Sequence, residues 1–253
     1  MSIFLTLAFL FFIGAILGWG LEVFYRRFFS KSNPDRHWIN PGFCTGPWLP
    51  LYGSGLCILY LLAGLEKYHI TGSLWGNRLL LFLVMTVCMT AIEYIAGILS
   101  IKVAKVRLWD YTNCWGNIQG IICPTFSLAW GVLGAIYYFG IHPYIREALL
   151  WLSENLAFSF VIGMFYGVFL IDLAHSVQLT ARMKAFADEN EIIVRYEDVK
   201  LHIRQFRERA GMRAYFMFAF RSELPIVEHL KEAREAWEER KRDKKPGKIS
   251  GHP

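Results

Sequence analysis

Two glutamates lie inside long apolar stretches, where a charged side chain is costly to bury. Glu22 lies near the end of the first stretch, and Glu93 lies in the third, 71 residues later. A carboxylate at this depth must face a polar cavity, meet a partner on another helix or take up a proton. Arg26 can pair with Glu22 four residues on, whereas Glu93 has no Lys or Arg at helical spacing. Glu93 is therefore the stronger candidate for function, the alternative being that it only bonds neighbouring donors and holds helices together.

The same pattern of residues follows each glutamate. Arg-x-Trp begins fourteen residues after it, and Gly-x3-Gly-x3-Pro comes next, with three more residues before the first Gly in the second copy. The pattern predicts a tandem repeat of a two-helix unit, over residues 3–65 and 79–140, of the kind that builds a central site in many transporters. Its members are Arg36, Trp38, Gly42, Gly46 and Pro50, then Arg107, Trp109, Gly116, Gly120 and Pro124.

The chemistry of this pattern allows two interpretations. Trp and Arg are typical anchors at the cytoplasmic face of a membrane, or each Arg pairs with a Glu of the repeats. The Gly-rich loops and the following Pro suit irregular backbone that lines a polar site. Asp110, Tyr111 and Asn117 add polar groups in the second copy. Free N–H groups of the helices that Pro50 and Pro124 open would favour an anionic group there. The alternative is that the loops are compact turns without a ligand.

Composition indicates a membrane protein with one polar end. A soluble domain carries roughly 25% charged residues, whereas this chain carries 19% and has a mean hydropathy of +0.32. Thirty of its 48 charged residues lie in residues 176–253. Five stretches approach the roughly 20 apolar residues that a membrane-spanning helix needs: 3–24, 48–65, 79–101, 118–140 and 156–175. The predicted fold is therefore all-α: a transmembrane domain, residues 1–175, in which the fifth span is unpaired, and a charged helical cytoplasmic tail, residues 176–253.

The placement of basic residues predicts the orientation. The loops after the first and third spans hold seven Lys and Arg, and those after the second and fourth hold three. Basic loops stay in the cytoplasm, so we expect a multi-pass protein of the bacterial cytoplasmic membrane, with its N-terminus outside and its C-terminus inside. The first span lacks a basic leader and a clear cleavage site, so we expect it to be retained. The net charge of +6 fits anionic lipid better than nucleic acid, which we exclude as a partner.

Further residues were weighed as metal, redox or packing elements. The five cysteines include no Cys-x-x-Cys pair, and Asp172 with His175 offers only two ligands, so we predict neither a metal site nor a cofactor. Gly14-x3-Gly18 and Gly163-x3-Gly167 are small-residue faces that allow close helix approach. In the tail, apolar spacing predicts helices over 192–212 and 224–245, around an aromatic run at 215–220 and before an unstructured end at 246–253.

The two loop segments also resemble a known family. Residues 40–53, and residues 107–124 with their Trp-Asp-Tyr and Gly-Asn-Ile-Gln-Gly sequences, are similar to signature segments of the bacterial ABC-transporter type IV family of CmpB-like permeases. Ile92-Glu93-Tyr94 fits the acidic position that precedes the second segment. The resemblance covers residues 10–175 and not the charged tail. It implies a multi-span membrane protein that works as a permease.

Three functions are compatible with these residues. The first is a permease subunit with a polar site between the repeats, near the cytoplasmic side, in contact with lipid. Because the chain has no phosphate-binding Gly-x4-Gly-Lys-Ser/Thr motif, an ATPase would be a separate chain, docking on residues 176–253, and a homodimer is plausible. The second is an intramembrane enzyme that acts on lipid headgroups with Glu22 and Glu93 as acid and base. The third is an assembly or sensor protein whose tail recruits a cytosolic partner.

Overall fold

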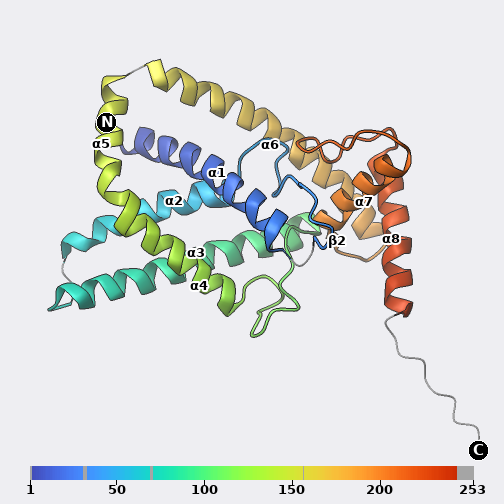
Figure 1. Ribbon diagram of the computed structural model, residues 1–253, viewed down its shortest axis with the longest axis horizontal. Coiled ribbons are helices and arrows are strands. Elements are labelled where there is room, and N and C mark those ends of the chain that lie inside the picture. The colour runs from blue at the N-terminus through green and yellow to red at the C-terminus, as the bar shows by residue number, and fades with distance from the viewer. Residues whose placement is uncertain (1, 31–32, 69–70, 156, 244–253) are drawn as a thin grey trace, which may run out of the picture.

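The computed structural model describes residues 2–30, 33–68, 71–155 and 157–243, which form a mostly helical molecule (Figure 1). The helices are α1 (Ile3–Phe28), α2 (Pro50–Ala63), α3 (Leu74–Ala104), α4 (Pro124–Ile136), α5 (His142–Glu154), α6 (Ala157–Glu189), α7 (Tyr196–Arg209) and α8 (Ile226–Asp243). A 3-10 turn, η1 (Gly64–Tyr68), extends α2, and a π turn, η2 (Tyr137–Ile141), joins α4 to α5. The strands are β1 (Val106–Arg107) and β2 (Val194–Arg195).

Four of these segments are long and apolar enough to cross a membrane. They are Ile3–Phe28, Leu74–Ala104, Pro124–Ile145 and Ala157–Glu189. Only 22–28% of their most apolar windows is buried within the chain, which leaves the rest of each apolar surface to hydrocarbon or to another subunit. The chain is therefore a multi-pass membrane protein.

The second predicted span is shorter than the others. Its α-helix has 14 residues, or about 21 Å at 1.5 Å per residue, against a hydrocarbon thickness of about 30 Å. Pro50 occupies the first turn, where its missing N–H costs no hydrogen bond, and so fixes the start of the helix. The expected start at residue 48 is thus two residues early, and η1 continues the chain toward α3.

Helices α1 and α2 are packed through the glycines of the first span. A Cβ placed on Gly14 would lie 2.8 Å from Leu56 Cβ, and one on Gly18 would lie 2.2 Å from Tyr52 Cβ. The two backbones therefore approach at a separation that only glycine allows. Gly163 and Gly167 on α6 have open space at the same position, so the second small-residue face contacts nothing within the described chain.

Helix α4 begins later than expected and continues further. Residues 118–123 belong to the preceding loop, where Ile118 and Ile122 form an isolated bridge, and Pro124 opens the helix. The π turn then carries the path into the amphipathic helix α5, which the sequence did not predict. One end of the molecule is formed by α5 and by the beginning of α1, α3 and α6, as Figure 1 shows.

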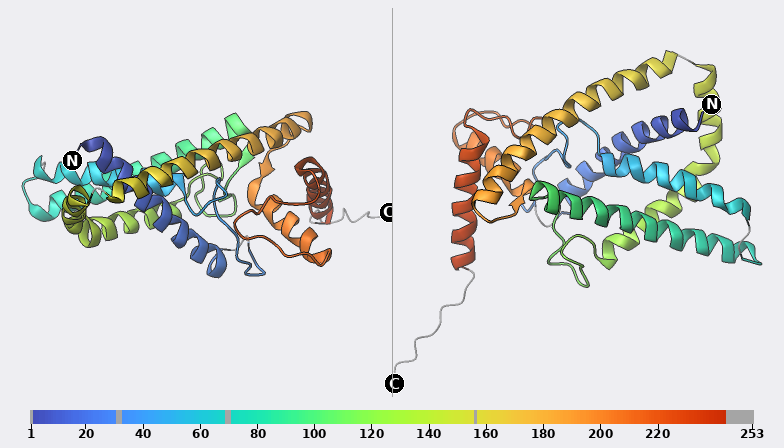
Figure 2. Two further views of the ribbon diagram at one scale, coloured as in Figure 1. Left: turned by 90° about the horizontal axis from the view of Figure 1, so that it is seen from above. Right: turned by 180° about the vertical axis from the view of Figure 1, so that it is seen from behind.

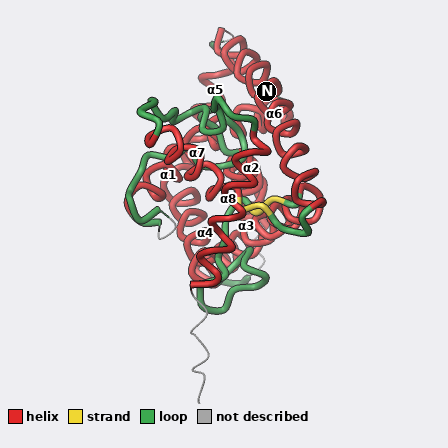
Figure 3. The backbone as a smooth tube through the Cα atoms, turned by 90° about the vertical axis from the view of Figure 1, so that its right-hand side faces the viewer, coloured by secondary structure: helices red, strands yellow, loops and turns green. Residues whose placement is uncertain are grey.

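The opposite end collects the two Gly-rich loops and the tail (Figures 1 and 2). Helix α6 runs unbroken across the predicted boundary at 175–176 and reaches Glu189. Strand β2 pairs in parallel with β1, with Val106 opposite Val194, so the chain is not purely α-helical; Figure 3 shows this pair among the helices. A compact core forms around the pair, from Val106, Met183, Phe186, Ala187, Val194, Tyr196, Val199, Ile203 and Leu230.

The tail contains the two expected helices with different limits. Helix α7 occupies Tyr196–Arg209 within the predicted 192–212, and α8 occupies Ile226–Asp243 within 224–245. The aromatic run at 215–220 lies in the connection between them. The expected unstructured end at 246–253 lies outside the described residues.

Candidate functional site

Glu22 is the centre of a hydrogen-bonded chain that joins α2, α1 and α7. Tyr52 donates its hydroxyl to Glu22 Oε2 at 3.0 Å, and Arg26 donates Nε to Glu22 Oε1 at 3.0 Å. The same guanidinium reaches Glu197 of α7, with Nη1 2.5 Å from Oε2. The anticipated pair of Glu22 with Arg26 thus forms, and the tail adds a second carboxylate to the same arginine.

Glu93 is buried on α3 with one oxygen unused. Its side chain is 3% exposed, and Tyr111 of the second loop donates its hydroxyl to Oε1 at 3.0 Å. The other oxygen, Oε2, is buried and receives no well-oriented hydrogen bond, although the indole of Trp130 lies beside the carboxylate. A buried acceptor without a donor costs free energy, so this oxygen, like the buried Glu197 Oε1, needs a ligand or a proton.

The groups around the two glutamates form one cluster. Glu22 lies close enough to Glu93 for their two carboxylates to interact electrostatically. Aromatic rings close the space between them: Tyr52 packs on Trp130 at 5.0 Å, and Tyr111 stacks on Phe126 at 4.2 Å between ring centroids. We call Glu22, Arg26, Tyr52, Glu93, Tyr111 and Glu197 the carboxylate cluster.

Neither Arg-x-Trp arginine contacts the glutamates in the described structure. Arg36 donates to the carbonyl of Ser30, and Arg107 pairs with Asp110 at 3.2 Å. The sharper interpretation, in which each of these arginines pairs with a glutamate, is therefore wrong, and Arg26 takes that role for Glu22. Both arginines follow the end of their helix in the chain, and interactions with nearby residues of the connecting segments hold them there.

The first Gly-rich loop, residues 38–49, is anchored by Asp172 of α6. Its carboxylate accepts hydrogen bonds from the backbone N–H and the hydroxyl of Thr45, from Gly46 N at 2.9 Å and from the Trp48 indole at 2.9 Å. The sequence offered Asp172 as one of two possible metal ligands, with His175. Instead it is buried and works as an anchor for the loop, while His175 is exposed.

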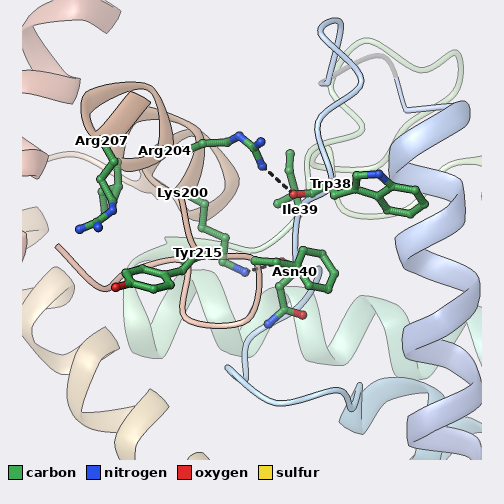
Figure 4. A pocket seen from close by; sticks show the side chains of 10 residues that line it. Trp38, Ile39, Asn40, Lys200, Arg204, Arg207 and Tyr215 are labelled. Atoms are coloured by element: carbon green, nitrogen blue, oxygen red, sulfur yellow. Dashed lines mark hydrogen bonds between the residues drawn. The ribbon is translucent and has the colours of Figure 1, made fainter. Parts of the chain in front are cut away.

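The same loop is held from the tail by α7. Lys200 donates to the carbonyls of Asn40 and Gly42 at 2.9 and 2.8 Å, and Arg204 donates to the carbonyl of Trp38 at 2.9 Å (Figure 4). Tyr196 donates its hydroxyl to the carbonyl of Phe43 at 2.9 Å. Burial lowers the pKa of Lys200 to about 7, with a smaller contribution from the positive charge of Arg26.

The second Gly-rich loop, residues 107–123, is held mainly by its own side chains. Asn117 accepts from Gly120 N at 3.0 Å and donates to the carbonyls of Thr112 and Cys114 at 3.0 and 2.9 Å. The indole of Trp109 donates to the carbonyl of Ile121 at 2.9 Å. The loop is thus a compact turn closed by hydrogen bonds, as the simpler of the two interpretations expected.

Asp110 connects this second loop to the tail. Besides Arg107 it meets Arg195, with Oδ2 3.1 Å from Nη2, and it accepts from Thr112 N at 3.0 Å. Burial alone would raise the pKa of Asp110, but the hydrogen bonds from Thr112 and the charges of Arg195 and Arg107 lower it below its ordinary value. The carboxylate therefore stays ionised and fixes the start of the loop.

The four repeat glycines have different roles. Gly42, Gly116 and Gly120 have positive φ angles of 80°, 64° and 67°, which glycine adopts without strain. A Cβ on Gly120 would lie 2.5 Å from Arg107 Nη1, whereas one on Gly46 would lie 2.0 Å from the Trp48 ring. These glycines allow tight turns and close packing, and the carboxylate cluster itself uses none of them.

Trp38 lies apart from the carboxylate cluster, beside an apolar groove. Its ring is 43% exposed, packs edge-on against Phe24 and Phe28, and lies under Arg27 at 5.3 Å. The groove measures about 420 Å³ and is lined by Trp19, Gly20, Val23, Phe24, Trp38 and Phe216. This environment is typical of an aromatic anchor at a membrane surface.

Comparison with known proteins assigns the fold to a family. A family model described as "Putative ABC-transporter type IV", of the CmpB type, matches residues 9–177. The chain belongs to this family. No curated protein and no solved structure matches the chain.

The family region and the tail divide the site unequally. Glu22, Glu93 and Asp172 lie inside the matched residues of this ABC-transporter type IV chain, whereas Glu197 and Lys200 lie beyond them. Sequence reasoning did not assign Tyr52, Glu197 or Lys200 to the site. The opening turn after Pro50 could have pointed to Tyr52, but no pattern distinguishes Glu197 and Lys200 from the other charges of the tail.

Proposed function

We propose that this protein is the membrane permease subunit of a transporter and that the carboxylate cluster is its substrate site, near the cytoplasmic side. The observation that carries this proposal is the buried Glu93 Oε2 without a donor, in a family of ABC-transporter type. A bare carboxylate oxygen at this depth is unfavourable unless a ligand or a proton satisfies it at some stage of the cycle.

The charge of the cluster favours a cationic or hydrogen-bond-donating group of the substrate. The cluster holds three carboxylates, of Glu22, Glu93 and Glu197, and one guanidinium, that of Arg26, which pairs with Glu22 and Glu197 but not with Glu93. Tyr52 and Tyr111 already donate hydrogen bonds from their hydroxyl groups to Glu22 and Glu93. This surplus of acceptors argues against the anionic group that the helix N-termini favoured.

The repeat and the orientation are part of the same proposal. Pro50 and Pro124 both open a helix directly after a Gly-rich loop, and both loops lie at the end of the molecule that carries the tail (Figure 1). The excess of Lys and Arg at that end supports a cytoplasmic location for it in a bacterium, with the N-terminus outside. A domain boundary inside α6, at 175–176, separates the spans from the tail in function, though the helix is continuous.

The partners follow from the surfaces. The weakly buried spans require lipid, and the open face at Gly163 and Gly167 suits a second copy of the chain. An ATPase on a separate chain would supply the energy, as expected of an ABC transporter, and would bind at the cytoplasmic loops and tail.

The experiment is co-purification followed by a functional assay. The full chain, isolated from its own host membrane in mild detergent, should carry a P-loop ATPase with it. In proteoliposomes, that ATPase is screened for stimulation by cationic and neutral solutes. Glu93→Gln should lose the stimulation, while Glu147→Gln, an exposed carboxylate on α5, should retain it.

Three outcomes decide between the candidate functions. A Glu93→Gln protein with the stimulation of wild type removes Glu93 from the site. Purification without any ATPase argues against an ABC permease. Acid–base catalysis on lipid headgroups is not favoured by the geometry, because both oxygens of Glu22 are occupied by Tyr52 and Arg26; release of a headgroup from vesicles, abolished by Glu22→Gln, would restore that function.

A further inference from the structure

Three metal-binding side chains meet where α7 packs against α8. His202 comes from α7, while His229 and Glu232, three residues apart, share one face of α8. One ligand atom of each lies within 4.8 Å of the other two, and His202 Nε2 is 3.1 Å from Glu232 Oε2. Two ligand atoms on a tetrahedral Zn²⁺ are roughly 3.3 Å apart when each bond is about 2.0 Å. Small side-chain movements would therefore bring all three onto one ion.

His229 is prepared for such a role by its surroundings. The residue is 0% exposed, and its Nε2 lies 2.7 Å from Ser222 Oγ. Its other nitrogen, Nδ1, is buried and has no hydrogen-bond partner. If Nε2 carries the proton and donates it to Ser222, Nδ1 presents a lone pair. A hydrogen bond that fixes the tautomer of a histidine in this way is typical of metal ligands.

We propose that His202, His229 and Glu232 form a binding site for a divalent transition-metal ion of the Zn²⁺ class. Two imidazoles and a carboxylate suit Zn²⁺, whereas Mg²⁺ and Ca²⁺ prefer oxygen ligands. The side chain of Glu232 is 48% exposed, so the site opens to solvent and leaves a fourth position for water. The site lies outside residues 9–177, which the family model matches.

The ion would clip the two tail helices together and thereby support the first Gly-rich loop. His202 lies on α7 between Lys200 and Arg204, whose side chains hold that loop. Helix α8 is attached to the rest through α6 and α7, so joining α8 to α7 restrains the support of the loop. An ion that binds only the folded chain also raises its stability according to its concentration. This inference does not depend on the transport proposal.

The test is metal binding by the full chain without a histidine tag. Protein in detergent is freed of metal with a chelator, and Zn²⁺ is titrated against a fluorescent chelator of known affinity. We expect one Zn²⁺ per chain and binding at least tenfold weaker in His202→Gln and Glu232→Gln. His175→Gln, which removes an exposed histidine on α6, is the matched control and should bind like wild type.

Two further measurements distinguish this site from adventitious binding. X-ray absorption of the Zn²⁺ form should show two imidazoles with Zn–N distances of about 2.0–2.1 Å. Zn²⁺ should raise the melting temperature of wild type and of His175→Gln, but not of Glu232→Gln. Unchanged affinity in either ligand variant, no Zn²⁺ bound at micromolar concentration, or equal weakening in His175→Gln would each overturn the proposal.

Discussion

The two Gly-rich loops follow the same sequence pattern, yet different parts of the molecule hold them. The first loop, residues 38–49, is fixed by Asp172 of α6 and by Lys200 and Arg204 of α7. The second loop, residues 107–123, is closed by Asn117 and Trp109 within it. The first therefore depends on residues more than 120 positions away in sequence, because the anchors of Thr45 and Asn40 lie 127 and 160 residues later.

The difference shows how a repeated motif can acquire two functions. The second loop, which is closed mainly by its own hydrogen bonds, should depend less on the tail, which it meets through Asp110 and Arg195. A loop held by α6 and α7 moves when those helices move. The second loop adjoins the carboxylate cluster through Tyr111, which reaches Glu93, and the tail adjoins it through Glu197, which pairs with Arg26. Changes in the tail should thus reach the cluster directly through Glu197, and should disturb the first loop more than the second.

The largest expected effect comes from Asp172→Ala. The substitution leaves buried donors of Thr45, Gly46 and Trp48 without an acceptor, and should lower the free energy of unfolding by roughly 3–5 kcal/mol. Melting of the detergent-solubilised protein, followed by tryptophan fluorescence, measures this. Hydrogen exchange should rise in residues 38–49 and not in 107–123. A loss below about 0.5 kcal/mol, within the ordinary range for surface changes, would contradict the role of Asp172 as an anchor.

Lys200→Met should change how stability varies with pH. Because the folded pKa of Lys200 is lowered to about 7, the unfolded chain binds one more proton than the folded chain between pH 7 and the ordinary pKa of lysine, about 10.4. Stability of wild type should therefore rise with pH across this window, by this group's contribution, and be flat with respect to it below pH 7. Melting temperatures from pH 6 to 10 should show a smaller rise in the variant. Parallel curves for wild type and variant would show that burial does not lower the pKa of Lys200.

Asn117→Ala should open the second loop alone. It removes the acceptor of Gly120 N and the donor to two carbonyls, and should cost about 1–2 kcal/mol. Limited proteolysis should show faster cleavage within residues 107–123. Unchanged cleavage there, or faster cleavage across 38–49, would show that the two loops do not have separate supports.

The smallest effects come from two arginines of the tail and form a matched pair. Arg195→Ala removes an ion pair with Asp110 in which the arginine is 56% exposed, and should cost at most about 0.5 kcal/mol. Arg204→Ala removes the bond to the Trp38 carbonyl and should cost about 1 kcal/mol, with faster hydrogen exchange around residue 38. The comparison fails if Arg195→Ala is the more damaging of the two.

The apolar body could be predicted from sequence because length and hydropathy determine it. The four long spans, and the start of helices at Pro50 and Pro124, follow from local chemistry. The buried state of Glu93 followed from the cost of a charge in hydrocarbon. What escaped prediction depends on long-range contacts: α5, the β1–β2 pair and the insertion of Glu197 and Lys200 arise from packing between distant segments.

Sequence position also misled the assignment of cations. Arg36 and Arg107 drew attention because they recur, but their loops turn before they can reach back to the glutamates. Arg26 was predicted only as a local partner of Glu22, although its guanidinium has enough donors to reach a second carboxylate, that of Glu197. The repeated arginines, Arg36 and Arg107, thus stabilise the loops, whereas Arg26, which has no counterpart in the repeat, supplies the positive charge of the cluster.

Helix α6 is a single rod of 33 residues, about 50 Å long at 1.5 Å per residue. Its first half is apolar and only partly buried in the chain, and its last turns pack in the core around β1 and β2 with Met183 and Phe186. Asp172 lies between these two halves, so the continuous helix connects the cores at its two ends to the first loop, which Asp172 holds. A force on α8 that tilts this rod would therefore also move Thr45, which Asp172 holds.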